Sequence, residues 1–209
     1  MDAVKNITEL LALIIYIFIS GQLYAQEQPM DLNEIYPPDR LLNQQSLIKY
    51  GEDIKKMLTD NRFPEALEHV DHYFYPQLTH YSETFPEALT STLVWVNHIY
   101  STSSSHSGKS TQTGEMYLSL VEQHPNQFKP EEKFNVLWRT GIAYRKISKL
   151  EKSQTLIDNG FKLLNDCELL NEAELKGYLF ISSANLRLEA GRLSEAKTDL
   201  DSAKNYCSS

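Results

Sequence analysis

The sequence predicts an all-α fold that consists of about four antiparallel helical hairpins. Apolar residues recur at spacings of three and four, which is the pattern of a helix with one buried face. Proline or glycine lies where several of these runs begin or end. Small residues recur as well: Ala66, Ser153 and Ala196 are separated by 87 and 43 residues. Since 87 is close to twice 43, we expect another small residue near position 110.

The clearest copies of the hairpin lie within residues 134–207. They are residues 137–144 (LWRTGIAY) and 183–196 (SANLRLEAGRLSEA), in which Gly191 can end a helix in the left-handed conformation. This pattern resembles the tetratricopeptide repeat (TPR). The resemblance implies an α-solenoid, a TPR-like superhelix of stacked hairpins. The period of 43 residues exceeds the roughly 34 residues usual for that family, so we expect a long-helix variant.

Residues 1–25 are typical of a secretory signal peptide. Lys5 precedes an apolar run over residues 10–19, which is too short to span a membrane, and Ala25 offers a cleavage site before polar residues. A periplasmic or secreted protein is therefore expected, with no membrane span after cleavage. Asp2 and Glu9 are unusual in such a segment, so an uncleaved membrane anchor is the alternative.

After the signal peptide, residues 26–40 form a polar lead-in, and the helical repeat domain is expected over residues 41–207. The first hairpin has a polar turn at residues 60–62. Its second helix starts beside Pro64, near the position where proline is best tolerated. Farther along, Pro76 predicts a kink or an early end of that helix.

The second hairpin begins near Pro86, and the third begins at Pro130. Between them, residues 101–114 are rich in serine and threonine, and we expect a flexible inter-helix loop that contributes nothing to the core. This segment includes residues 108–111 (GKST), which match the end of a phosphate-binding P-loop. Because Ser103 stands where the leading glycine belongs, nucleotide binding is disfavoured.

Composition and motifs argue against the other classes of site. The net charge of -8 lacks the basic footprint of a nucleic-acid-binding protein. His69 and His72 could supply half of a zinc site, but the sequence has no HExxH or CxxC motif. We therefore expect no metal, no cofactor and no enzymatic activity.

The two cysteines end the last two hairpins. A disulfide between Cys167 and Cys207 requires the loop that carries Cys167 to lean inward. Free thiols are one alternative, and pairing with another chain through Cys207 is the other. Self-association through the C-terminal helix is a related expectation.

The resemblance to TPR proteins also implies a concave groove, lined by the first helix of each hairpin, that holds a peptide or a helix of a partner protein. Transferred to the two clear copies, the groove residues are Asn135, Trp138, Ile142, Arg145, Tyr178, Ile181, Asn185 and Leu188. Trp138 is the strongest candidate, and its alternative role is a core residue between hairpins.

The sequence thus favours an exported, non-catalytic scaffold that binds a protein or peptide. The alternative is the N-terminal sensory or ligand-binding region of a longer signalling or regulatory protein.

Overall fold

The computed structural model describes residues 30–37, 40–125, 128–167, 169 and 171–207, so the expected signal peptide lies outside the described residues. The chain divides into two units, Met1–Pro37 and Pro38–Ser209. The described part of the first unit contains helix α2 (Leu32–Ile35), whose N-cap Asp31 accepts a hydrogen bond from the Asn33 amide at 2.9 Å. The segment predicted to be a polar lead-in thus includes one helical turn.

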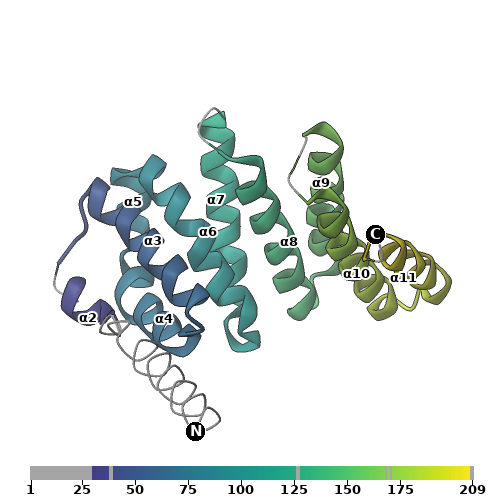
Figure 1. The fold of residues 1–209 in the computed structure, drawn as a ribbon, viewed down its shortest axis with the longest axis horizontal. Coiled ribbons are helices and arrows are strands. Elements are labelled where there is room, and N and C mark those ends of the chain that lie inside the picture. Colours follow the sequence, from purple (N-terminus) through teal and green to yellow (C-terminus); the bar gives the residue numbers. More distant parts are fainter. Residues whose placement is uncertain (1–29, 38–39, 126–127, 168, 170, 208–209) are drawn as a thin grey trace, which may run out of the picture. The chain divides into compact units, whose positions relative to one another are not determined.

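The described part of the second unit is built from helices, in agreement with the predicted all-α class, and neighbouring helices pack against one another along the chain (Figure 1). The α-helices of this unit are α3 (Gln44–Thr59), α4 (Phe63–His69), α5 (Leu78–Thr84), α6 (Pro86–Thr102), α7 (Ser107–Gln123), α8 (Pro130–Lys146), α9 (Leu150–Asp166), α10 (Glu172–Glu189) and α11 (Leu193–Cys207).

The helix ends follow local chemistry that the sequence already shows. Pro86 and Pro130 are the first residues of α6 and α8, where the missing amide hydrogen costs no intrahelical bond. Asn43 caps α3 by accepting a hydrogen bond from the Ser46 amide at 2.9 Å. After α10, Gly191 adopts a φ of +74°, as predicted for a glycine that ends a helix.

The predicted kink at Pro76 is confirmed. Helix α4 passes into a π-helical turn, Val70–Phe74, and then into a 3-10 turn, Tyr75–Gln77, before α5 begins. Proline has no amide hydrogen and its ring crowds the preceding turn, so a regular α-helix cannot run through this position.

The predicted loop over residues 101–114 is wrong, because α6 extends to Thr102 and α7 begins at Ser107. Within α7, the hydroxyl groups of Thr111 and Thr113 donate to backbone carbonyls three and four residues earlier, at 2.8 and 2.9 Å. Hydroxyl groups satisfied by their own helix can be buried at little cost. Both threonines are accordingly buried.

The small residue expected near position 110 is present. Ser110 has no exposed surface, and the same holds for Ala66, Ser153 and Ala196. Each of these residues lies in a helix that packs against the preceding one, so a small side chain at this position allows two helices to approach closely.

Hydrogen bonds between α3, α6 and α8 join residues that are about one predicted period apart. The Thr92 hydroxyl donates to the Leu47 carbonyl, 45 residues earlier, at 2.8 Å. Farther along, the Asn97 amide nitrogen lies 3.3 Å from the Thr140 hydroxyl, a separation of 43 residues. These bonds hold α3 to α6 and α6 to α8.

Candidate functional site

One side of three helices carries the predicted groove residues and two further side chains. We call this side the α6–α8–α10 face. Along α8 and α10 the predicted residues are spaced by three and four, which places them on one side of each helix. The face comprises Trp95, His98, Asn135, Trp138, Ile142, Arg145, Tyr178, Ile181, Asn185 and Leu188.

Trp138 links α8 to α10. Its ring stacks on the ring of Tyr178, with the centroids 5.0 Å apart and an interplanar angle of 13°. Its indole nitrogen donates to the Ser182 hydroxyl at 2.8 Å. The side chain is half-buried and packs against the apolar core of the C-terminal half. Trp138 is therefore in part a core residue between hairpins, and the rest of its side chain reaches the surface.

The other predicted residues of α8 are partly engaged within the chain. Arg145 forms an ion pair with Glu189 and so joins the ends of α8 and α10. Asn135 donates to the Glu131 carbonyl at 2.9 Å. Ile142 is half-buried between these two positions along the helix. These contacts fix the side chains and leave a surface of mixed polarity.

On α10 the predicted residues are more accessible. Ile181 and Leu188 are 40% and 44% exposed, and Asn185 is exposed between them. Two apolar side chains seven residues apart lie on the same side of a helix. Because their burial contributes little to folding, they are available for a contact with another molecule.

Sequence reasoning missed Trp95 and His98 on α6. Trp95 precedes Trp138 by 43 residues, so the only two tryptophans of the chain occupy matching positions in α6 and α8. Both are half-buried, and the Lys55 ammonium lies 5.0 Å from the centroid of the Trp95 ring. The 43-residue interval was the signal that could have identified Trp95.

His98 and Arg139 form the electrostatic part of this surface. Burial, and then the nearby positive charge of Arg139, lower the pKa of His98 to about 4. Burial also lowers the pKa of Arg139 to about 10, so the guanidinium remains charged at neutral pH. It lies 5.1 Å from the centroid of the Trp138 ring, close enough for a cation–π interaction.

The P-loop-like residues 108–111 lie in the first turns of α7 and form no phosphate-binding loop. Lys109 is paired with Asp71, and its ammonium lies 4.7 Å from the centroid of the Tyr75 ring. Burial would raise the pKa of Asp71, but hydrogen bonds from Lys109 and Tyr100 outweigh it and lower that pKa. Lys109 is thus engaged in a contact between α7 and the π-helical turn.

His69 and His72 do not converge on a common point. His69 is buried, and its Nδ1 lies 3.0 Å from the Tyr50 hydroxyl. His72 is exposed, with its Nδ1 2.9 Å from the Glu68 carbonyl oxygen. Among the described residues, no group of three or more His, Cys, Asp or Glu side chains could hold a metal ion.

Cys167 follows α9 directly and is half-buried. The side chain of Cys207 lies outside the described residues, so the disulfide between the two stays a prediction.

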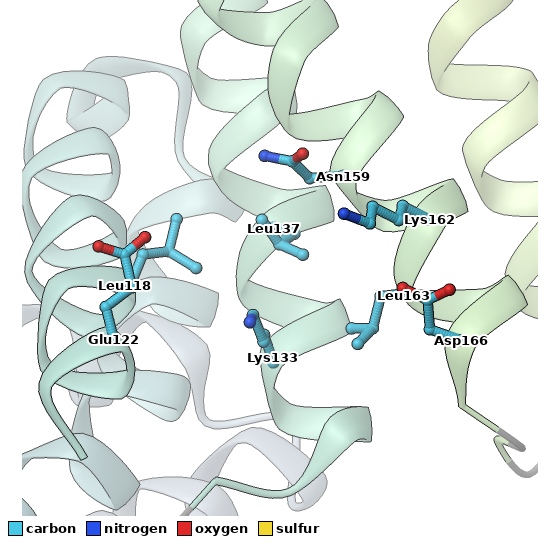
Figure 2. Close-up of a pocket in the computed structure, with 8 residues that line it drawn as sticks. All are labelled: Leu118, Glu122, Lys133, Leu137, Asn159, Lys162, Leu163 and Asp166. Carbon is cyan, nitrogen blue, oxygen red and sulfur yellow. The ribbon is translucent and has the colours of Figure 1, made fainter. Parts of the chain in front are cut away.

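A pocket of about 330 Å³ lies between α7, α8 and α9, and none of the predicted groove residues lines it (Figure 2). Two lysines, two acids, an asparagine and three leucines surround it. These residues are Leu118, Glu122, Lys133, Leu137, Asn159, Lys162, Leu163 and Asp166. A lining that combines charges of both signs with three leucines suits a small polar molecule that carries both charges.

Comparisons with known proteins identified no relative of this chain. No family model matches the chain, and neither the curated proteins nor the solved structures include a significant match. Within the described residues, no helix has the length and apolar character that a membrane span requires.

Proposed function

We propose that this chain is an exported scaffold without catalytic activity, and that it binds a protein or peptide along the α6–α8–α10 face. The proposed architecture is an α-solenoid of about four hairpins, a TPR-like superhelix. It is supported by the hydrogen bonds between α3, α6 and α8, which join residues 43 to 45 positions apart. It is supported as well by the Trp138–Ser182 bond between α8 and α10, which spans 44 positions.

The observation that carries the proposal is the row of apolar side chains along the face. Trp95, Trp138 and Ile181 follow one another at intervals of 43 residues, so each of three helices contributes one large apolar residue at the same position. Aromatic residues that are rigid and partly accessible are frequent energetic anchors of protein interfaces. The stacking and the hydrogen bond of Trp138 supply that rigidity.

The test is site-specific photo-crosslinking in the cells that express the full chain. A photo-reactive amino acid replaces the exposed Ile181, and in a second variant it replaces the exposed Leu188. The control position is Thr155, which is exposed on α9. We expect the same partner protein to be captured from both α10 positions, and we expect no capture from Thr155.

A variant in which Leu188 is changed to Ser should reduce the capture at Ile181, because the two side chains share one surface. Leu188 is a better choice than Trp138 for this purpose, since Trp138 also packs against the core. Equal capture at Thr155 and at the α10 positions would contradict the proposed binding face.

A second candidate function is the ligand-binding region of a longer signalling protein, and the pocket between α7, α8 and α9 favours it. The test is thermal unfolding with free amino acids and dipeptides as probes. A ligand that binds the folded state raises the melting temperature with concentration. A rise that is lost in Lys133→Met would support this function, and no rise with any probe would count against it.

A further inference from the structure

The basic side chains between α6 and α8 contrast with the acidic character of the chain. The net charge is -8, yet two cations of α8 reach the same residue near the end of α6. Arg139 lies 3.4 Å from the Ser101 hydroxyl, and the Lys146 ammonium donates to the Ser101 carbonyl at 2.9 Å. Within the described residues, neither cation forms an ion pair with a carboxylate.

Several other half-buried cations among the described residues are paired with a carboxylate, whereas Lys133 lies 4.9 Å from the centroid of the Phe128 ring. Arg187 forms an ion pair with the buried Asp199 at 3.1 Å, and Lys109 is paired with Asp71. Removing a charge from water is unfavourable unless an opposite charge compensates for it. Arg139 likewise has no carboxylate partner among the described residues. Its guanidinium is desolvated enough to lower its pKa, the nearby Tyr178 phenol partly offsets that shift, and its described contacts are the Ser101 hydroxyl and the Trp138 ring.

Lys146 has a local explanation that does not extend to Arg139. A cation at the C-terminal end of a helix is stabilised by the free carbonyls there, and Lys146 binds such a carbonyl on α6. The hydrogen bond described for Arg139 is instead to the Ser101 side chain, at a distance that makes it weak. Most of its donor groups therefore have no described role in holding the fold.

Two aromatic side chains, Trp138 and His98, lie near this guanidinium. Trp138 lies under it at 5.1 Å, and the neighbouring His98 is close enough for the charge of Arg139 to lower its pKa. The ring of His98 in turn lies 6.4 Å from the ring of Trp95. Trp95, His98, Arg139 and Trp138 thus form a continuous group, which we call the α6–α8 basic group.

We propose that the α6–α8 basic group receives a side-chain carboxylate from an extended acidic segment of the partner protein. This inference rests on the proposed function and specifies the chemistry of the partner. A guanidinium binds a carboxylate through two parallel hydrogen bonds, and Lys146 adds positive charge nearby. An apolar residue of the same segment packs against the accessible surface of the tryptophans.

Selection from a phage-displayed library of random dodecapeptides tests the inference. The purified full chain is the target, and Arg139→Gln and Lys197→Gln are the two variant targets. Lys197 is exposed on α11 and its change removes the same charge far from the basic group in sequence. We expect the wild-type chain and Lys197→Gln to enrich Asp and Glu in the selected peptides, and we expect Arg139→Gln to lose that enrichment.

A second measurement needs no variant of the protein. The strongest selected peptide is resynthesised with Gln in place of Glu and Asn in place of Asp, and both peptides are titrated against the wild-type chain. Loss of a charge-assisted contact predicts about tenfold weaker binding of the neutral peptide, or about 1.4 kcal/mol. This comparison remains decisive even if Arg139→Gln fails to fold.

The outcomes separate the two proposals. Selection of peptides without acidic enrichment, or equal affinity for the acidic and neutral peptides, would refute the α6–α8 basic group as a carboxylate site and leave the binding face intact. If the wild-type chain selects no peptide above the level of a Leu188→Ser target, both the face and the inference built on it are refuted.

Discussion

Gly114 and Gly108 lie in the same helix, α7, but a methyl group added at each would meet different surroundings. At Gly114 the new Cβ would lie 2.0 Å from the Thr140 hydroxyl oxygen and 2.7 Å from the Thr140 methyl carbon. At Gly108 it would meet no atom within 4 Å. Because Gly→Ala favours a helix in general, the two substitutions should have opposite effects on stability.

The magnitude for Gly114→Ala follows from the contact with Thr140. Thr140 is fully buried, so it can relieve the overlap only by rotating or by moving α8 away from α7. Rotation would break its contact with Asn97, and overpacking of this kind costs roughly 1–3 kcal/mol. We expect Gly114→Ala to lower the free energy of unfolding by about 2 kcal/mol. Gly108→Ala should raise it by roughly 0.5 kcal/mol.

Urea denaturation followed by circular dichroism measures both variants against the wild-type chain. Changing Thr140 to Ala in addition to Gly114→Ala removes the two closest atoms and should restore part of the lost stability. If Gly114→Ala is as stable as Gly108→Ala, then α7 does not pack against α8 at this point. The loop predicted from the serine- and threonine-rich sequence would then be the better description.

Three further predictions concern single interactions. The pKa of His98 is lowered to about 4, below its unfolded value of about 6.5, so the unfolded state takes up a proton first as the pH falls. The free energy of unfolding should therefore drop by roughly 1–2 kcal/mol between pH 7 and pH 4.5, a range that allows for solvent screening. Urea titrations at the two pH values measure this drop, and it should be smaller in His98→Gln. A double-mutant cycle of Trp138→Phe and Ser182→Ala should give a coupling energy of about 1 kcal/mol, and additive effects would mean that their hydrogen bond contributes nothing. Gly191→Ala should lower the melting temperature by a few degrees, since an alanine at a φ of +74° is strained by about 1 kcal/mol. An unchanged melting temperature would exclude the left-handed backbone conformation at residue 191.

The helix boundaries were the part of the fold that could be predicted best from the sequence, because they depend on single residues with strong local preferences. Pro86, Pro130 and Gly191 mark helix ends in the sequence and in the structure alike. Residues 101–114 were not predicted correctly, because composition alone does not show that a threonine hydroxyl will bond to its own helix. The spacing of small residues nevertheless pointed to Ser110, so periodicity was the more reliable guide there than composition.

The candidate site could be predicted only in part. The TPR-like motif predicted groove residues on α8 and α10 but was too degenerate on α6 to predict Trp95. Arg139 was missed for a different reason, since a sequence lists charges and does not show which of them lack a partner. That information depends on the packing of α6 against α8, which places Ser101 and no described acidic group beside the guanidinium.

The position shared by Trp95, Trp138 and Ile181 connects stability with recognition. Trp138 is half-buried because Tyr178 and Ser182 of the next helix pack against it, whereas Ile181 is 40% exposed. The stability of the fold does not require an apolar residue at an exposed position, because a side chain that stays in contact with water contributes little hydrophobic stabilisation. A contact made by all three helices with one extended segment would bury the exposed part of each side chain. The same apolar position in three alternate helices, α6, α8 and α10, therefore supports the proposed binding along the α6–α8–α10 face.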